Sequence, residues 1–319
     1  GTHQLIDAVR IEPDVYLPTD FPDTGPTLRP FVPAVRVLPL FMDLPLMSGE
    51  EVEHAPHLAL TAQPWPGSVA VYDAATDADY ALNEIIAARA VVGVTETPLF
   101  AAPAGRIDRG ARLQLRMLSG TLQSIGDAAL LAGGNLLAIG DGTPGNWELL
   151  QFRDAEVVGA GRWLVSHRLR GQFGTDAAIP EAWPAGSWVV RLDGTPQQIA
   201  LAAAMRQQQR HYRIGPAQRG YDDPSYVHEV HAFDGNGLRP YRPVHLRAEP
   251  SGSGVALGWV RRTRIDGDGW ELSEVPLGEE AEAYRLRVMQ GDTLVRSVDV
   301  AAPAWSYDPA QDGLSGDYR

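Results

Sequence analysis

Short runs in which apolar and polar residues alternate recur along the chain from about residue 60 onward. A period of two is typical of a β-strand that buries one of its faces. In the run 162–170, the odd-numbered residues from Trp163 to Leu169 are predicted to share the buried face, which leaves Arg168 and Arg170 on the exposed one. A Gly-Ala-Gly turn precedes this run, so the pattern predicts an antiparallel meander. Strands are expected over 35–41, 68–72, 90–94, 112–116, 146–152, 155–158, 162–170, 187–192 and 212–214.

Two short helices are expected to interrupt these strands. One covers residues 127–131, with Ser124 as its cap and two glycines after it. The segment 195–198, Thr-Pro-Gln-Gln, has the spacing of a capping box with proline in the first turn, and it predicts a second helix that ends by Met205. The segment 219–237 is rich in Gly, Asp and Pro and is expected to link two domains.

Residues 238–319 form a distinct unit with its own alternation. Short alternating strands that are separated by glycine-rich turns are typical of a β-sandwich. The strands are expected at 244–248, 255–259 and 284–288, and the turns at 251–254 and 266–269.

The first 60 residues are acidic and rich in proline. Proline fixes φ and removes a backbone donor, so no long helix fits here and an extended lead-in is predicted. We expect a β domain at 61–236 and a terminal sandwich at 237–319. The expected fold class is therefore mainly β, with several antiparallel sheets or sandwiches and one or two short helices. The recurring prolines are at positions 13, 18, 22, 26, 30 and 33.

Composition narrows the range of functions. The 319 residues carry a net charge of −13, so a nucleic-acid surface would work against the protein's own field. There is no cysteine, which excludes disulfides, thiolate metal sites and a cysteine nucleophile. There is also no lysine for a phosphate-binding loop. No Gly-x-Ser-x-Gly elbow occurs, and no Gly-x-Gly-x-x-Gly fingerprint stands before a helix.

The ends of the sequence suggest a fragment of a longer protein. It begins without Met and without a signal-peptide pattern, and it ends on Arg319. No apolar run approaches the roughly 18 residues that span a bilayer.

Three clusters of polar residues suggest catalysis or metal binding at first sight. His228 and His231 are three residues apart, and on a strand such residues point to opposite faces, so the pair could ligate one ion only on a helix or in a turn. The Asp-Gly-Asp-Gly run at 266–269 favours a hairpin turn over a calcium loop. The glutamates near Glu279 favour a solvated loop over the paired carboxylates of a glycosidase. We predict no catalytic residue, no cofactor and no metal.

Several arginines and tryptophans are candidates for contact with a partner. Arginines on the predicted strand at 162–170, together with those from 206 to 213, could form one basic patch, and those from 261 to 264 another. Two tryptophans beside prolines could stack on sugar rings or on a partner. The alternatives are ordinary solvated strand faces, and loop tryptophans packed against a neighbouring domain. The candidate contact residues are Trp65, Trp183, Arg168, Arg170, Arg261 and Arg262.

Two stretches carry a resemblance to a known family. They are Gly-Asn-Trp-Glu-Leu-Leu-Gln-Phe at 145–152 and Leu-Arg-Gly-Gln-Phe-Gly-Thr-Asp at 169–176. Together they resemble the tail-tip proteins of long-tailed phages, and more closely the host-specificity proteins of gene transfer agents, the phage-like particles of alphaproteobacteria. The resemblance extends over roughly residues 60–305. Supporting stretches are 118–122, 213–217, 238–248, 259–266 and 275–280.

The resemblance implies hub-type β domains that form a trimer at the tail tip of an extracellular particle. The implied partners are other tail proteins and a host-envelope saccharide or protein. In that family a glycosidase-like barrel precedes this region, and its activity does not transfer to the sequence at hand. Residues 238–319 resemble a fibronectin type III domain, with Trp259 as the core tryptophan of its second strand and Tyr284 as the aromatic of its third. Two more strands would be expected after Tyr307, so this sandwich is either truncated or completed by another chain.

The expected function is therefore that of a non-enzymatic component of a phage-like tail tip or baseplate. It would contribute to assembly and to recognition of the host surface. The alternative is a carbohydrate-active module that binds or hydrolyses sugars, and a third option is a scaffold without a ligand.

Overall fold

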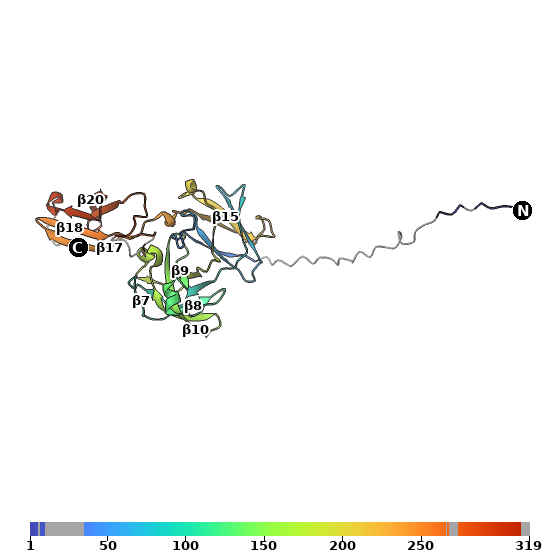
Figure 1. The fold of residues 1–319 in the computed structure, drawn as a ribbon, viewed down its shortest axis with the longest axis horizontal. Helices are drawn as coiled ribbons and strands as arrows, with labels where there is room; N and C mark the ends of the chain where they lie inside the picture. Colours follow the sequence, from blue (N-terminus) through green and yellow to red (C-terminus); the bar gives the residue numbers. More distant parts are fainter. Residues whose placement is uncertain (6, 10–34, 266, 268–273, 314–319) are drawn as a thin grey trace. The chain divides into compact units, whose positions relative to one another are not determined.

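The computed structural model describes residues 1–5, 7–9, 35–265, 267 and 274–313 (Figure 1). Within these residues the regular structure is mostly antiparallel β-strand, arranged in six sheets, and helices are few and short. The predicted mainly β fold class is confirmed. The recurring prolines from 13 to 33 and, apart from Gly267, the predicted turn at 266–269 lie outside the described residues.

Six strands close into an antiparallel barrel, which the sequence pattern did not predict. The strand β10 makes closure possible, because its first residues pair with β9 and its later residues with β11, while Gln151 pairs with both. A further short strand, β7 (Ile107–Asp108), lies beside the end of β11. In order around the barrel the strands are β9 (Leu136–Gly140), β10 (Trp147–Gly159), β11 (Arg162–Leu169), β8 (Leu113–Met117), β5 (Val92–Thr95) and β13 (Trp188–Arg191).

The barrel strands place alternate residues inside and outside, as the period of two requires. On β9, Leu137 and Ile139 belong to the interior core together with Leu113 of β8, whereas Leu136 and Ala138 belong to a second core on the outside of the barrel. Both faces of β9 are therefore buried, which is why its sequence is a continuous apolar run rather than an alternating one.

A three-stranded sheet covers that outer core. It consists of β1 (Leu38–Met42), β2 (His57–Thr61) and β14 (Gln197–Gln198). Leu40 and Met42 pack on the barrel side, and Phe41 and Leu58 pack on the other side, so this sheet is buried on both faces. The predicted boundary at residue 60 falls inside β2. Residues 38–60 of the segment assigned to an extended lead-in thus supply β1 and most of β2, whose residues are nearly all buried.

A four-stranded sheet packs against the opposite side of β1 and β2. Its strands, in order, are β16 (Val227–His231), β15 (Arg210–Pro216), β3 (Val69–Ala74) and β4 (Ala81–Ile86). Val69, Val71 and Ile214 face this core, and the other face of the sheet carries polar side chains. The segment 219–237, predicted to be a linker, contains β16 and is part of this sheet. A separate pair is formed by β6 (Leu99–Phe100) and β12 (Ala182–Trp183).

The C-terminal unit contains two small sheets. The strands β17 (Val244–Ser251), β18 (Gly254–Val260) and β21 (Ala304–Tyr307) form one, and β19 (Tyr284–Gln290) and β20 (Thr293–Val300) the other. Trp259 packs edge-to-face on Tyr284, with ring centroids 5.0 Å apart, although both residues are only half-buried. After Tyr307 the described chain forms a 3-10 turn (Pro309–Asp312) and no further strand through residue 313.

One of the two predicted helices is present. The helix α1 (Asp127–Leu131) matches the prediction, but its cap is Gly126, because the Ser124 hydroxyl bonds the backbone of Ala155 instead. The helix predicted from residue 195 is wrong. Edge pairing with β2 draws the two glutamines of the motif into β14, and only a 3-10 turn follows. The 3-10 turns are Gln172–Ala178, Ala203–Met205, Asn236–Leu238 and Pro309–Asp312. Among the described residues no helix has the length and apolar character to cross a membrane.

Candidate functional site

The alternation predicted for β11 breaks at His167. Val165 is buried as predicted, but further along the strand Arg168 is only 1 % exposed and Arg170 0 %. His167 has a φ of 53°, in the left-handed region that non-glycine residues rarely adopt. This residue shifts the phase of the strand, so the later even-numbered residues turn inward. The prediction that Arg168 and Arg170 are surface contact residues is therefore wrong.

Arg170 forms a fully buried ion pair with Glu148 on β10. Its Nε and Nη2 lie 2.5 and 2.8 Å from the two carboxylate oxygens of Glu148, and both side chains are 0 % exposed. The third guanidinium nitrogen donates to the carbonyl of Phe100 at 2.7 Å. Trp183 donates its indole N–H to Glu148 at 2.7 Å and is 3 % exposed, so it is part of this cluster and not a surface platform.

Arg168 forms a second buried pair, with Asp108 of β7. Nε and Nη2 donate to Asp108 Oδ2 at 3.0 and 2.7 Å, and Nη1 donates to the carbonyl of Val165. Burial raises the pKa of Asp108, but the hydrogen bonds from the Gly110 N–H and Arg168 outweigh it. The pKa of this carboxyl is therefore lowered. The two ion pairs tie β7, β10 and the end of β11 together.

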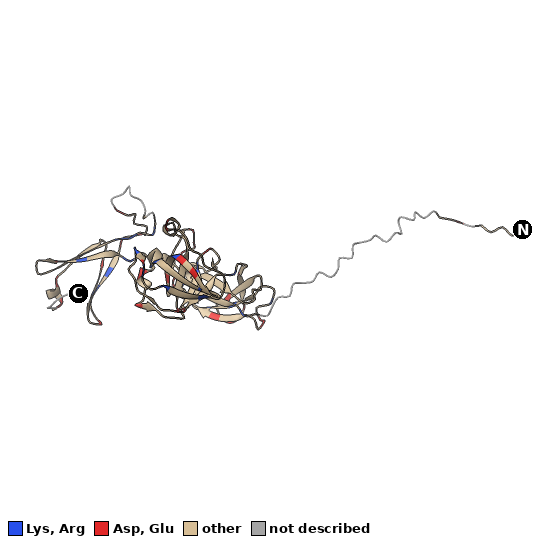
Figure 2. Cartoon of the chain, turned by 90° about the horizontal axis from the view of Figure 1, so that it is seen from below, with Lys and Arg blue, Asp and Glu red and all other residues tan. Residues whose placement is uncertain are grey.

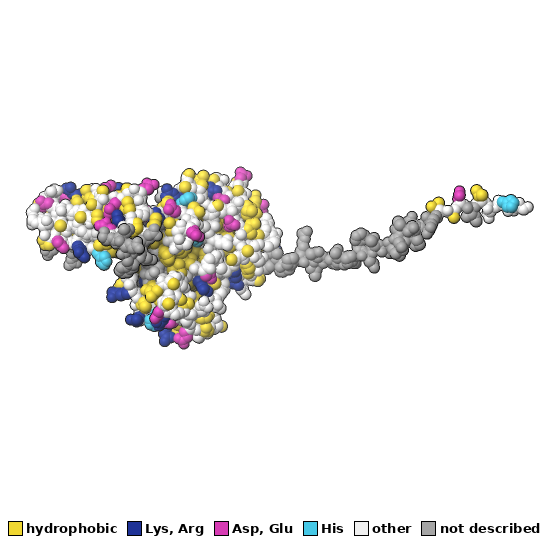
Figure 3. Space-filling model, in the orientation of Figure 1, with side chains coloured by type: hydrophobic (Ala, Val, Ile, Leu, Met, Phe, Trp, Pro, Cys, Tyr) yellow, Lys and Arg dark blue, Asp and Glu magenta, His cyan; other side chains and the backbone are white. Residues whose placement is uncertain are grey.

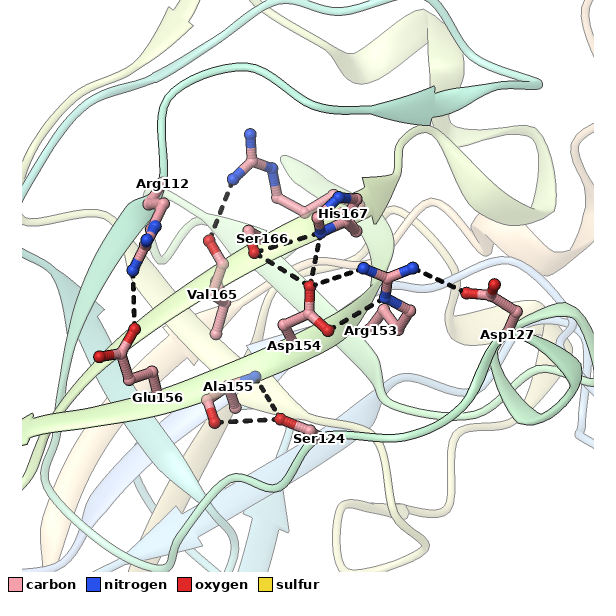
Figure 4. Close-up of polar contacts among 11 residues, drawn as sticks. Arg112, Ser124, Asp127, Arg153, Asp154, Ala155, Glu156, Val165, Ser166 and His167 are labelled. Atoms are coloured by element: carbon pink, nitrogen blue, oxygen red, sulfur yellow. Dashed lines mark hydrogen bonds and ion pairs between the residues drawn. The ribbon is translucent and has the colours of Figure 1, made fainter.

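The same phase shift turns His167 outward, beside Asp154 of β10 (Figure 4). Nδ1 of His167 lies 2.5 Å from Asp154 Oδ2, and Arg153 holds both oxygens of that carboxylate at 3.0 and 3.1 Å. Hydrogen bonds from Arg153, then from His167 and Ser166, outweigh burial and lower the pKa of Asp154. Arg153 also reaches Asp127 at the start of α1. An ionised carboxylate thus fixes the imidazole ring in one orientation.

Ser166 lies on the same side of the ring as Asp154. Its hydroxyl is 3.2 Å from Asp154 Oδ2 and 3.4 Å from Nδ1 of His167. In a serine hydrolase the serine meets the ring nitrogen that the aspartate does not use. The three residues therefore do not form a nucleophilic triad. What the arrangement offers is the Nε2 of an oriented imidazole, which can exchange a hydrogen bond or a proton with a ligand.

A surface pocket of about 390 Å³ lies at this position. The side chains that line it include both positive and negative ones. Among them, Arg112 and Glu156 form an ion pair, with Nη1 of the arginine 2.7 Å from a carboxylate oxygen. Such a lining suits a neutral polyhydroxylated or zwitterionic ligand better than a strongly charged one. The lining residues are Arg109, Gly110, Arg112, Asp154, Glu156, Leu164, Ser166 and His167.

Sequence reasoning missed Asp154, although a signal for it existed. Counting outward from the predicted glycine turn at 159–161 places residue 154 opposite residue 166, and Ser166 is directly opposite Asp154 in the structure. The left-handed backbone of His167 brings its ring to the same carboxylate. Glu148 carried no comparable signal, because its partners come from the residue that follows β11 and from β12.

The remaining predicted contact residues are engaged within the chain. Trp65 is half-buried against the core that contains Phe41, and its indole N–H donates to Ala87 at 3.2 Å. Arg261 pairs with Glu282 at 3.2 Å. Arginines 206, 210 and 213 do not merge into one basic patch; for example, Arg213 pairs with an aspartate at 2.9 Å. Residues of both charges are interspersed along the chain (Figure 2), and side chains of both charges are interspersed on the face of the molecule in view (Figure 3).

Arg262 joins the C-terminal sheets to the 3-10 turn that follows β11. Its Nη2 lies 2.7 Å from Asp176, its Nε donates to the carbonyl of Arg242, and its guanidinium lies 5.4 Å from the ring centre of Tyr241. Gly174 contacts the same tyrosine ring so closely that an added Cβ would lie 2.4 Å from it. Arg262 is thus an intramolecular contact residue.

One part of the chain matches a known protein family. Residues 90–190 match the family model described as Rcc01698-like, C-terminal. The match covers about a third of the chain and runs through the barrel, from just before β5 into β13. Both buried ion pairs and the pocket beside His167 lie within it. No curated protein matches the chain.

Proposed function

We propose that this chain is a structural component of a phage-like tail tip or baseplate, of the gene transfer agent or long-tailed phage type. In this proposal it contributes to assembly of the particle and to recognition of the host surface, and it has no enzymatic role. Its partners are other tail proteins, within a homotrimer, and a saccharide or protein of the host envelope. Its location is the tail tip of the released particle.

One observation carries the proposal. The two stretches that resemble tail-tip proteins, 145–152 and 169–176, are separated in the sequence. In the barrel they form one buried unit. Glu148 of the first accepts hydrogen bonds from Arg170 of the second, and the Leu149 N–H donates to the Thr175 hydroxyl at 2.9 Å. Because these residues hold strands together, the resemblance lies in the framework of the fold, where likeness between structural proteins is expected.

The test is to locate the chain on particles from the organism that encodes it. Gold-labelled antibodies raised against the full chain should decorate one end of the tail in electron micrographs, and antibodies against the major capsid protein serve as the control. Purified full-length chain should also bind envelopes of the host in a saturable manner. Absence of the chain from purified particles would refute the proposal.

A carbohydrate-active module is the second candidate, and the pocket beside His167 is the observation that favours it. A polar lining in which both charges are paired and an oriented imidazole are suited to sugar hydroxyl groups. Incubation of the chain with host peptidoglycan, beside His167→Ala, distinguishes the two candidates. Release of soluble sugar fragments that depends on His167 would support the module, and binding without release would leave the structural role in place.

A further inference from the structure

Two histidines and one aspartate meet on the polar face of the four-stranded sheet. His211 of β15 and His228 of β16 stack with their ring centroids 5.2 Å apart and 14° between the ring planes. Nδ1 of His211 lies 3.0 Å from Nε2 of His228, which in turn lies 3.8 Å from Oδ1 of Asp77, in the turn between β3 and β4. In the part of the chain that the structure describes, this is the one group of three potential metal ligands with its donor atoms within 4.8 Å of one another.

The pairing of β15 with β16 creates this group. Arg213 lies opposite His228 and His211 opposite Val230, so the two histidines are diagonal neighbours on one face of the sheet. His231 points to the other face, where its ring lies 4.5 Å from that of Phe41. The sequence prediction that His228 and His231 on a strand point to opposite faces therefore holds. The partner of His228 comes instead from the neighbouring strand.

The two ring nitrogens are 3.0 Å apart, within hydrogen-bond distance of each other. When no cation is present, a proton on one of them must satisfy the contact. A tetrahedral Zn²⁺ ion with Zn–N distances of about 2.0–2.1 Å separates two imidazole nitrogens by about 3.4 Å, so a shift of a few tenths of an ångström admits the ion. The third ligand is the carboxylate of Asp77, which accepts hydrogen bonds from the Tyr80 hydroxyl at 2.6 Å and from Nη2 of Arg213 at 2.9 Å.

We propose that Asp77, His211 and His228 form a Zn²⁺ site that leaves one coordination position open. The side chains of His228 and Asp77 are 37 % and 47 % exposed, so the ion exchanges with solvent and the open position accepts water or a donor group from outside the chain. Binding would tie the turn after β3 to the edge strand β16, across the full width of β15.

Arg213 is the group that opposes this site. Its Nη2 donates to Oδ1 of Asp77 at 2.9 Å, which places a positive charge beside the proposed ion. A unit charge and a divalent ion about 4 Å apart in water repel by about 2 kcal/mol, a factor of about thirty in affinity. Arg213→Gln is therefore expected to bind Zn²⁺ about thirtyfold more tightly, a change in the opposite direction from that of the ligand variants.

The experiment is a calorimetric titration of ZnCl₂ into the full chain, prepared without a histidine tag and treated with a chelator. We expect one Zn²⁺ per chain at this site. His211→Ala and His228→Ala should each weaken binding about tenfold or more, and Asp77→Asn should weaken it to a smaller extent. His245→Ala is the matched control, because His245 is exposed on β17 and belongs to no such group. Far-UV circular dichroism checks that every variant is folded.

Bound Co²⁺ provides a second readout that does not depend on heat signals. Its visible d–d absorption should appear with the wild-type chain and disappear in the His211→Ala/His228→Ala double variant. The proposal is overturned if wild-type chain binds no Zn²⁺ at about 1 mM, or if the double variant binds Zn²⁺ and Co²⁺ as the wild type does. In either case the two rings only bond to one another.

Discussion

Replacing Glu148 by glutamine removes the carboxylate that faces the buried Arg170. The carboxylate accepts two hydrogen bonds from this guanidinium, one from the indole of Trp183 and one from the N–H of Gly171. A glutamine amide keeps one acceptor oxygen and turns an NH₂ group toward at least two of these donors. Since Arg170 is 0 % exposed, its charge is left without its main partner. Loss of one partner from a buried ion pair costs about 3–5 kcal/mol.

Urea unfolding followed by tryptophan fluorescence measures this cost. With an m-value of about 3 kcal/mol per M, the transition midpoint should fall by about 1–1.7 M. Glu156→Gln is the matched control: it is the same substitution on the same strand and also breaks an ion pair with arginine at 2.7 Å. That pair is 58 % and 63 % exposed, and loss of an exposed pair costs about 1 kcal/mol or less.

A second variant separates the charge from the packing. In Glu148→Gln/Arg170→Met both charges are gone, so no ion is left buried, and replacement of whole buried pairs is often close to neutral. We expect the double variant to be more stable than Glu148→Gln alone. Equal costs for the two single glutamine variants, or a double variant less stable than Glu148→Gln, would refute the reasoning.

Three further predictions concern other parts of the fold. Asp43 is 3 % exposed and accepts three backbone N–H bonds from residues 234–236, so Asp43→Asn should cost about 1–3 kcal/mol in urea unfolding, and an unchanged midpoint would contradict this. Gly174→Ala should lower the thermal midpoint more than Gly186→Ala, because both positions have positive φ but only Gly174 would drive a Cβ into Tyr241. The pKa of Asp77 is lowered from 3.8 to about 2, so the ionised Asp77 carboxylate stabilises the fold above pH 3.8, and this stabilisation is lost as the pH falls toward 2. The thermal midpoint should therefore fall less steeply with pH over that range in Asp77→Asn than in the wild type. An equally steep fall in the variant would contradict this prediction.

Local sequence pattern was enough for much of the secondary structure. The strands at 112–116 and 162–170 were found because a strand with one wet face alternates, and alternation can be seen within five residues. The helix at 127–131 was found because its end is also a local signal, the two glycines that follow it. Strands that are buried on both faces were harder to predict, because a short apolar run shows no alternation. The strand β9 was missed, and β2 was assigned to the lead-in.

The candidate site could not be predicted in the same way. The assignment of Arg168 and Arg170 to the surface followed correctly from the alternation, and it failed because His167 adopts a left-handed backbone conformation. Nothing adjacent in the sequence requires that conformation. It is held by the carboxylate of Asp154 on the neighbouring strand and by the burial of the two arginines against acidic partners on other strands.

The sequence by itself determined that this is a mainly β protein of antiparallel strands, because residue alternation and turn composition are local properties. The tertiary structure alone decided that six strands close into a barrel, that Glu148 meets Arg170 and that His211 meets His228. Each of these depends on strand register and on contacts between residues 17 or more positions apart. A shift of one residue in register would send every side chain to the opposite face, so charge pairs and ligand groups are set only when the whole sheet has formed.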